Sequence, residues 1–222
     1  MVESGIPKYL VIMNVKKTFL LVEDEALIRE GLKSLLQTES FVKQILEASG
    51  KKEFEIQIQH PVDIVLMDFR LGDANGLDLL PLIKKKDDGI KVIVVTGLEG
   101  AELILNLLRA GVHGIVYKLD GYKEIRNAVV NVMEGGTYFP DAILKIIQAN
   151  AHRWDQMPTV RLTFGERELL KSIATGLTTK EIAVQLKMSE ATTETYRLRL
   201  LKKLNVPNTA ALIAFAYRNG IL

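Results

Sequence analysis

The chain has 222 residues, of which 48% are hydrophobic and 25% are charged, and it contains no cysteine. This composition excludes a disordered chain, a disulfide framework and thiol chemistry. The absence of cysteine, and of any apolar run near the ~20 residues of a membrane helix, favours a cytoplasmic protein without membrane contact. The length suits two small domains, each with a core of its own.

Residues 1–16 are expected to form a loose extension ahead of the folded protein. The apolar segment Tyr9–Met13 is too short for the core of a signal peptide, and a basic pair follows it. Met13 is an alternative start of the folded protein.

From Thr18 onward, short β-rich apolar runs alternate with helical patterns. The expected strands are Thr18–Val22, Val42–Leu46, Asp63–Met67, Lys91–Val95 and Gly114–Lys118. The expected helices are Ala26–Gln37, Lys52–Gln59, Leu77–Lys84, Ala101–Arg109 and Tyr122–Glu134. Such alternation is typical of a parallel sheet covered by helices on both faces. The pattern therefore predicts an α/β domain with a flavodoxin-like, doubly wound, five-stranded parallel sheet.

The β signal ends at Gly135-Gly136, and the next segment is interpreted as a linker. It contains a helical stretch, Ala142–Ala149, and then Trp154, which we expect to pack the linker, and Pro158.

From Leu162 the sequence is helical, and the helix starts are marked by capping residues. Thr163 with Glu166 and Thr178 with Glu181 have capping-box spacing, and Ser189 and Asn208 begin two further helices. Gly176 falls where the first of these helices should end. A tight turn at Lys187-Met188 joins the second helix to the third. These features predict a small all-α domain of four helices with a helix-turn-helix arrangement.

The charge is distributed unevenly between the two parts. Residues 159–222 carry ten Lys and Arg against five Asp and Glu, whereas residues 1–158 carry nineteen against twenty-two. The basic part therefore has a net charge of +5 and the rest −3. This asymmetry favours an anionic partner such as nucleic acid for the C-terminal part, although ordinary surface charge also explains it.

Charged and polar residues follow the predicted strands of the α/β domain. Glu23 and Asp24 follow the first strand, Asp68 the third, and Thr96 and Lys118 end the fourth and fifth. The carboxyl ends of parallel strands lie at one edge of the sheet, and ligands of open α/β sheets bind at that edge. Clustered carboxylates suit Mg²⁺, an Asp can act as nucleophile toward phosphorus, and Lys118 can stabilise the phosphoryl oxygens.

These residues resemble the receiver domain of response regulators. The resemblance rests on Leu21–Glu25, Val65–Arg70 with Gly76 eight residues after the Asp, Val94–Gly97 and Tyr117-Lys118, and it covers residues 17–137. It implies Asp68 as phospho-acceptor, with Thr96 and Tyr117 as switch residues and Lys118 as phosphate clamp. It also implies Mg²⁺ as cofactor, with these ligands: Glu23, Asp24, Asp68 and the backbone carbonyl of Arg70.

The chain departs from the receiver pattern in the loop after Asp68. That loop usually contains Met-Pro and here contains Leu71-Gly72, which should loosen the loop without altering the chemistry. Arg70 and Leu98 occupy positions that tune the phosphate lifetime in the family, so the lifetime stays open. A phosphohydrolase with an Asp nucleophile is a weaker alternative, because it needs a second Asp where this chain has Arg70.

The C-terminal part resembles a LuxR-type DNA-binding domain. Four motifs occur in order at the family's spacing, namely Leu162–Glu168, Gly176–Ala183, Met188–Arg197 and Leu201–Val206. With a receiver at 17–137, a linker at 138–159 and this domain at 160–222, the chain resembles the NarL/FixJ class of transcription regulators.

The third of these helices is the expected DNA recognition helix. At 100° per residue, one stripe holds Thr193, Arg197, Leu200 and Leu204, with Tyr196 near it, and is expected to pack inward, with Arg197 snorkelling from its edge. The opposite stripe holds Ala191, Glu194, Thr195, Leu198 and Lys202 and is expected to face the major groove. In the family, Val and His are usual at the positions of Thr193 and Tyr196.

Individual contacts follow from side-chain chemistry. Glu194 can accept a hydrogen bond from cytosine N4, and Leu198 with the methyl of Thr195 can pack on thymine methyls. Lys180, Arg199, Lys202 and Lys203 suit phosphates. The full set of expected DNA-contacting residues is Lys180, Thr192, Glu194, Thr195, Arg197, Leu198, Arg199, Lys202 and Lys203.

The resemblance implies a transcription regulator rather than an enzyme, apart from self-catalysed phosphorylation and dephosphorylation. A sensor histidine kinase is expected to phosphorylate Asp68, and the phosphorylated chain is expected to form a homodimer on a two-fold related DNA site. Two alternatives remain: a helical bundle that binds protein, with Leu198 as an exposed anchor, and a DNA-binding regulator whose receiver is not phosphorylated.

Overall fold

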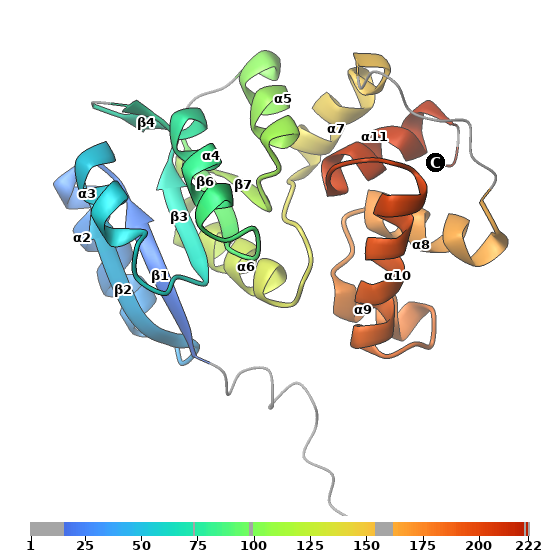
Figure 1. Cartoon of the computed structure of the whole chain (residues 1–222), viewed down its shortest axis with the longest axis horizontal. Coiled ribbons are helices and arrows are strands. Elements are labelled where there is room, and N and C mark those ends of the chain that lie inside the picture. The colour runs from blue at the N-terminus through green and yellow to red at the C-terminus, as the bar shows by residue number, and fades with distance from the viewer. Residues whose placement is uncertain (1–15, 73, 98–99, 154–161, 220, 222) are drawn as a thin grey trace, which may run out of the picture. The chain divides into compact units, whose positions relative to one another are not determined.

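The computed structural model describes residues 16–72, 74–97, 100–153, 162–219 and 221. The chain forms two compact units, Met1–Thr96 and Gly97–Leu222 (Figure 1). Trp154, expected to pack the linker, lies outside the described residues. None of the helices in the described ranges is both long and apolar enough to cross a membrane.

The strands form one five-stranded sheet in the order β2-β1-β3-β6-β7. Their bounds are β1 Lys17–Val22, β2 Val42–Ala48, β3 Ile64–Asp68, β6 Lys91–Thr96 and β7 Gly114–Tyr117. The pairs β1–β2, β1–β3 and β3–β6 are parallel. This is the flavodoxin-like strand order, and the predicted fold class is confirmed. All five residues of β3 are buried, as expected for a central strand covered on both faces.

Three helices of the first unit follow the pattern of the sequence closely. They are α2 (Ala26–Gln37), α3 (Lys51–Gln57) and α4 (Gly76–Lys86), and Figure 1 shows them around the strands of this unit. The helices α2 and α3 contact β2, and Phe19 of β1 packs near Phe41, with ring centroids 6.2 Å apart. Burial of these aromatic and aliphatic side chains stabilises the unit.

The short hairpin after β3 was not predicted. It consists of β4 (Arg70–Leu71) paired antiparallel with β5 (Ala74–Asn75). Two-residue strands are too short for a period of two to appear in the sequence, so the pattern gave no signal.

The second unit begins with elements that alternate as expected. They are α5 (Ala101–Ala110), β7, the short 3₁₀ helix η1 (Lys118–Asp120), α6 (Gly121–Met133), α7 (Asp141–Ala149) and the 3₁₀ helix η2 (Ala151–Arg153). The predicted apolar stripe of α5 is buried at Ile104, Leu105, Leu107 and Leu108.

Tyr138 adds an unpredicted backbone pairing at β7. Its N–H donates to the carbonyl of His113 at 2.9 Å, and its carbonyl accepts from the N–H of Ile115 at 3.0 Å. The Tyr138 hydroxyl donates to Glu124 of α6, and burial together with this hydrogen bond raises the pKa of Tyr138. The chain after Gly136 is therefore attached to the outer side of β7.

The four C-terminal helices begin at the four predicted caps. They are α8 (Phe164–Ala174), α9 (Thr179–Gln185), α10 (Glu190–Lys203) and α11 (Thr209–Arg218). Thr163 and Thr178 form complete capping boxes, and Ser189 and Asn208 each accept a backbone N–H. These caps satisfy donors that the first turn of a helix leaves free. The predicted helix-turn-helix arrangement of α9 and α10 is confirmed.

Backbone conformation ends these helices where the sequence indicates. Gly176 has φ +82°, and the N–H of Leu177 donates to the carbonyl of Ser172, as in a Schellman turn. Lys187, in the turn between α9 and α10, has φ +54° although it is not glycine. A β-branched residue there would be strained.

The last helix, α11, packs against helices on both sides of the linker in the second unit. Residues Ala210–Ala216 are each at most 2% exposed, because α11 contacts α8, α7, η2 and α5. A helix that is apolar all round is buried all round.

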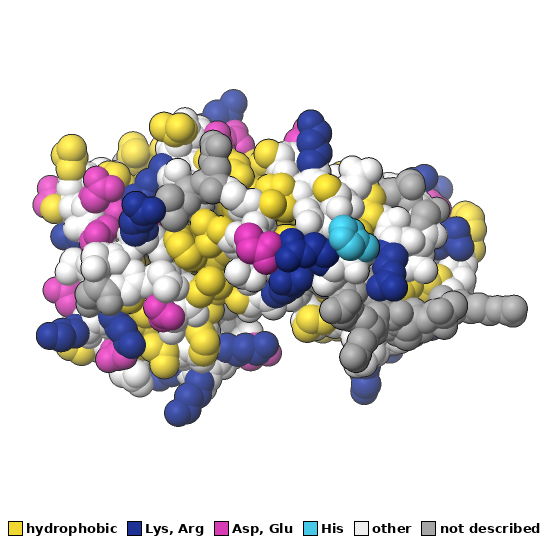
Figure 2. All heavy atoms as spheres, turned by 90° about the horizontal axis from the view of Figure 1, so that it is seen from above, with side chains coloured by type: hydrophobic (Ala, Val, Ile, Leu, Met, Phe, Trp, Pro, Cys, Tyr) yellow, Lys and Arg dark blue, Asp and Glu magenta, His cyan; other side chains and the backbone are white. Residues whose placement is uncertain are grey.

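On the face of the molecule shown in Figure 2, acidic and basic side chains are interspersed.

Candidate functional site

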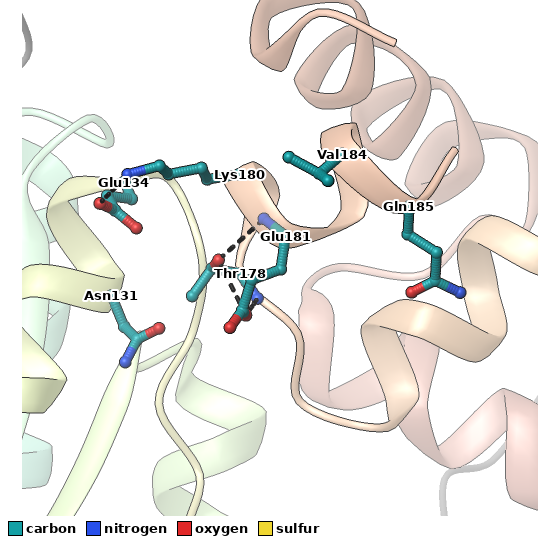
Figure 3. Close-up of a pocket in the computed structure, with 7 residues that line it drawn as sticks. All are labelled: Asn131, Glu134, Thr178, Lys180, Glu181, Val184 and Gln185. Atoms are coloured by element: carbon teal, nitrogen blue, oxygen red, sulfur yellow. Dashed lines mark hydrogen bonds and ion pairs between the residues drawn. The ribbon is translucent and has the colours of Figure 1, made fainter. Parts of the chain in front are cut away.

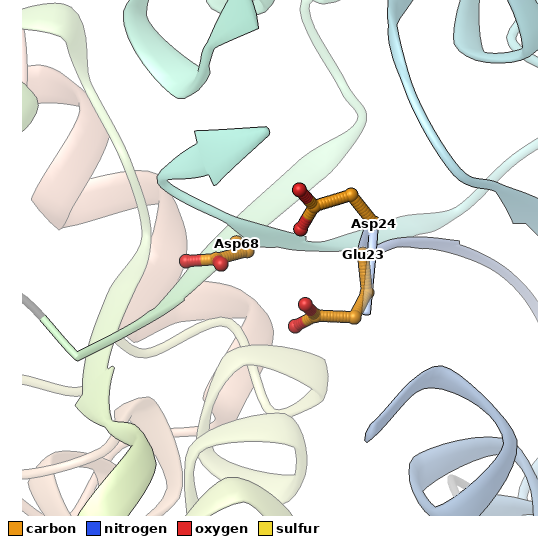
Figure 4. A group of neighbouring side chains, drawn as sticks. All are labelled: Glu23, Asp24 and Asp68. Carbon is orange, nitrogen blue, oxygen red and sulfur yellow. The ribbon is translucent and has the colours of Figure 1, made fainter. Parts of the chain in front are cut away.

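Three carboxylates meet at the carboxyl edge of the sheet in the first unit. Glu23 and Asp24 follow β1, and Asp68 ends β3, which is the parallel neighbour of β1. One carboxylate oxygen from each lies within 4.8 Å of the other two. Figure 4 shows Glu23 and Asp24 extending toward the side on which Asp68 lies. The predicted convergence of these three residues is confirmed.

Two of the three carboxylates in this cluster are buried. Glu23 is 1% and Asp68 6% exposed, whereas Asp24 is open to solvent. The N–H of Glu25 donates to Glu23 Oε1 at 3.3 Å, and Arg29 Nη1 donates to the Glu23 carbonyl at 2.7 Å. Oxygen ligands from two or three carboxylates with an open side are what a hard divalent cation prefers. The residues present therefore fit a magnesium ion that keeps several waters.

Gly76 allows the start of α4 to approach the end of β3. Its N–H donates to the carbonyl of Phe69 at 2.7 Å. A Cβ at this position would lie 2.9 Å from Met67 Cε and 3.3 Å from Phe69 Cα, so a side chain would require the Met67 side chain and the backbone of Phe69 to shift. A Cβ on Gly72 would lie 3.4 Å from Asp24 Oδ2. The loop after Asp68, which holds Arg70 in β4, is thus folded close against the acidic cluster.

Thr96 and Tyr117 end strands β6 and β7, whereas Lys118, predicted to end the fifth strand, is the first residue of η1 directly after β7. Thr96 is fully buried at the end of β6, one residue beyond Val95, the register partner of Asp68. Tyr117 ends β7 and Lys118 opens η1, and both are half-buried in the second unit. The geometry therefore places the hydroxyl of Thr96 on the strand next to Asp68.

The recognition helix α10 buries the predicted stripe. Thr193, Leu200 and Leu204 are at most 2% exposed, and Arg197 is 9% exposed. On the opposite side, Leu198 is 55% exposed, and Ala191, Thr195 and Lys202 are also exposed.

The prediction that Tyr196 points inward is wrong, because it is 43% exposed. At 100° per residue it lies about 70° from the centre of the buried stripe, so its long side chain extends along the surface of the helix. The guanidinium of Arg199 lies 5.6 Å from its ring centroid, a cation–π contact.

Hydroxyl groups on α10 are engaged with the helix itself. Thr195 Oγ1 donates to the Ala191 carbonyl at 2.9 Å, which leaves its methyl group as the outward surface. Thr192 Oγ1 lies 2.8 Å from the hydroxyl of the capping residue Ser189.

Some of the predicted phosphate-contacting cations have acidic partners in the structure. Lys203 Nζ donates to both carboxylate oxygens of Glu166, at 2.8 and 2.7 Å, and this hydrogen bond lowers the pKa of Glu166. Lys180 Nζ lies 3.7 Å from Glu134 Oε1. Nothing in the pattern of charges along the sequence identifies these long-range partners.

A shallow groove of about 530 Å³ lies between α6 and α9 in the second unit (Figure 3). Asn131 and Glu134 line it from α6, and the remaining residues come from the start and body of α9: Thr178, Lys180, Glu181, Val184 and Gln185. Gly135 and Gly136 pass close to it, since a Cβ on Gly136 would lie 3.3 Å from Thr178 Cα. The polar groups of Thr178 and Glu181 are used by the capping box.

The carboxylate cluster on the β2-β1-β3-β6-β7 sheet and the capped helix-turn-helix agree with two family models. Residues 19–130 match the response regulator receiver domain, and residues 160–216 match the bacterial regulatory proteins of the luxR family. The chain belongs to the response regulators that combine these two domains, and it is a two-component regulator with a DNA-binding domain.

Individual relatives agree over nearly the whole chain. The transcriptional regulatory protein MctR of Rhizobium johnstonii is 30% identical over 205 residues, which are 91% of this chain and 94% of MctR. Among solved structures, RcsB of Salmonella enterica serovar Typhimurium bound to the promoter rprA with the phosphomimetic BeF₃⁻ has a TM-score of 0.55 and 20% identity, covering 93% of this chain and 100% of RcsB. A structure of two RcsB dimers on two parallel DNAs has a TM-score of 0.56 and 19% identity, with the same coverage.

Proposed function

We propose that Asp68 is the phospho-acceptor of this regulator and that a sensor histidine kinase is the donor. The observation that carries this proposal is the meeting of Glu23, Asp24 and Asp68 at the ends of two neighbouring strands. A carboxylate oxygen of Asp68 attacks the phosphorus, the bond from phosphorus to the donor breaks, and an aspartyl phosphate forms. The same chemistry with a small acyl phosphate would be self-catalysed by the receiver.

Magnesium is the cofactor in this proposal. Glu23, Asp24, Asp68 and the backbone carbonyl of Arg70 would hold the ion, and it would supply positive charge beside the phosphoryl oxygens. Lys118 binds the phosphoryl group from the start of η1, directly after β7, Thr96 donates its hydroxyl to the phosphoryl group, and Tyr117 moves with Thr96.

The C-terminal domain, residues 160–222, binds DNA with α10 in the major groove. Phosphorylation of the receiver, residues 17–137, acts through the linker at 138–159 and favours a homodimer on a two-fold related site. The RcsB dimers on DNA support this assembly for a protein of the same fold. A regulator that binds the bacterial chromosome works in the cytoplasm.

The test of the phospho-acceptor is the intact mass of the full chain after incubation with Mg²⁺ and an acyl phosphate. We expect one phosphoryl group on the wild type and none on Asp68→Asn, because the amide cannot act as nucleophile. The matched control is Asp88→Asn, an exposed carboxylate 4.0 Å from Lys84, which should be phosphorylated like the wild type. Phosphorylation of Asp68→Asn, or none of the wild type, would contradict the assignment.

A protein partner for the C-terminal domain is a second candidate function. The exposure of Val184 at 76% and Leu198 at 55% favours it, because both are apolar side chains on α9 and α10. Salt separates the two functions: binding through phosphates weakens steeply as salt rises, whereas an apolar protein contact does not.

A further inference from the structure

Glu194 and Arg197 form an ion pair within the recognition helix. Arg197 Nη2 donates to Glu194 Oε1 at 3.0 Å, one turn apart on α10. Arg197 belongs to the buried stripe and is 9% exposed, whereas the side chain of Glu194 is 35% exposed. The guanidinium therefore lies behind the carboxylate, on the side of the helix away from the exposed residues Thr195 and Leu198.

Each partner keeps one atom without a hydrogen bond among the residues that the structure describes. These atoms are Glu194 Oε2 and Arg197 Nε, and both are buried. Glu194 Oε2 lies beside Gly135, where a Cβ would be 3.5 Å from it, and the Gly135 N–H already donates to the Val132 carbonyl. A buried acceptor without a donor is unfavourable, so Glu194 Oε2 should favour any arrangement that supplies an N–H, including one in which α10 separates from Gly135.

From this geometry we propose that Glu194 selects cytosine in the major groove and that Arg197 is the positioning residue that makes this selection possible. The inference rests on the proposed binding of DNA by α10 and names which base one position of the site must contain. Oε1 accepts from Arg197, so Oε2 is the atom left for the base. Because Oε2 is buried beside Gly135 in this structure, it reaches the base only after α10 has separated from Gly135.

The base edges of the major groove decide between the four bases. Only cytosine N4 and adenine N6 present donors there, while guanine and thymine present acceptors that repel a carboxylate. Adenine also carries the acceptor N7 next to its amino group, which disfavours a carboxylate relative to cytosine. The expected order at this position is therefore cytosine, then adenine, then guanine and thymine.

Arg197 is needed because a lone carboxylate is poorly suited to DNA. Its negative charge is repelled by the phosphates, and its side chain has several rotamers of which one points at a given base. The pairing with Arg197 offsets the charge and fixes the rotamer. Since Arg197 is buried in the stripe that packs against other helices, it is held in place before DNA binds.

Selection from a randomised DNA pool by the full-length, phosphorylated protein tests this proposal. We expect the wild type to require cytosine at one position of each half-site. Glu194→Gln should shift that position toward adenine, because an amide matches adenine N6 and N7 together. Arg197→Met, which keeps the buried volume, should lower the preference for cytosine at that position by about one order of magnitude and leave the others unchanged. Arg197→Lys should restore part of the preference.

Arg199→Met is the matched control on the same helix, since Arg199 is exposed and expected to contact phosphate. It should weaken binding equally for all sequences and reduce its salt dependence. If Arg197→Met behaves in this same way, or if Glu194→Gln keeps the cytosine preference, the inference is wrong. If the wild type enriches no sequence at all, the proposed DNA-binding function itself fails, which distinguishes that failure from the failure of the Glu194–Arg197 pair alone.

Discussion

Two adjacent lysines at the end of α10 have different surroundings and should have different roles. Lys202 is exposed on the side of α10 that holds Leu198, whereas Lys203 donates to both oxygens of Glu166 at the start of α8. Glu166 also accepts from the N–H of Thr163 in the capping box. The pair Lys203–Glu166 therefore links two helices of the DNA-binding domain, while Lys202 stays available for a phosphate.

Substitution of each lysine by glutamine separates these roles. Lys202→Gln should reduce the slope of log binding constant against log salt by about 0.9, the value for one lost phosphate contact. Lys203→Gln should leave this slope unchanged and lower the thermal stability. The measurements are fluorescence anisotropy at several salt concentrations and thermal unfolding. An equal change of slope in both variants would show that Lys203 also contacts DNA.

Glu166 predicts a pH dependence of stability. The hydrogen bond from Lys203 lowers its pKa below the ordinary 4.5 in the folded protein. A lowered folded-state pKa contributes stability above the unfolded pKa, and this contribution is lost as the pH falls through the folded pKa. The difference in unfolding free energy between wild type and Glu166→Gln should therefore be constant near pH 7 and shrink below about pH 4.5. Urea unfolding at a series of pH values measures it, and a difference independent of pH would contradict it.

The residues of the acidic cluster could be predicted because strand ends are set by the local pattern. The carboxyl ends of parallel strands share one edge, so identifying β1 and β3 was enough to bring Glu23, Asp24 and Asp68 together. The partner of Lys203 could not be predicted, because helical periodicity gives the side on which a residue lies and not the residue of another helix that it meets.

At the level of elements, the helix starts were the most predictable feature. The caps of α8 to α11 lie within three residues of the groups they bond, so the chain carries the whole signal locally. The β4–β5 hairpin and the pairing of Tyr138 with β7 had no such signal. The strands of the hairpin are too short to show an alternation of apolar and polar residues. The pairing of Tyr138 with β7 joins residues from separate parts of the sequence.

Asn208 caps two helices at once. Its Oδ1 accepts from the Ala211 N–H at 3.0 Å at the start of α11, and its Nδ2 donates to the Leu108 carbonyl at 3.1 Å at the end of α5. One amide therefore satisfies a free donor at the start of α11 and adds a second hydrogen bond to the Leu108 carbonyl, which also accepts from the Gly111 N–H at 3.1 Å.

Asn208→Asp keeps the cap of α11 but replaces the donor with a negative charge facing the negative end of α5. We expect it to lower the unfolding free energy by about 1–2 kcal/mol. Asn208→Ser also caps α11 and loses only the neutral hydrogen bond to α5, so it should cost less. Urea unfolding of both variants at neutral pH measures the difference, and equal stabilities would argue against the contact with Leu108.

For the whole molecule, the sequence indicated two domains and their classes, and the family matches confirm both. The compact units of the structure divide at Gly97, because α11 packs on α5 and α7 as well as on α8. Contacts of this kind depend on which apolar faces meet, and hydropathy along one chain does not specify that. The helix α5, which follows β6 in the chain, is one of the elements that contact α11.

The pairing of Tyr138 with β7 has a consequence for aggregation. β7 is the last strand of the sheet, and an uncovered edge strand is a template on which further chains can add. The backbone of Tyr138 occupies the N–H of Ile115 and the carbonyl of His113 on that edge. A fragment of residues 16–136 should therefore self-associate at concentrations where a fragment of residues 16–150 stays monomeric, which light scattering over a dilution series measures. Equal behaviour of the two fragments would mean that other residues protect the edge of β7. Self-association of the shorter fragment alone would show that the segment after α6 prevents fibre-like assembly at this edge.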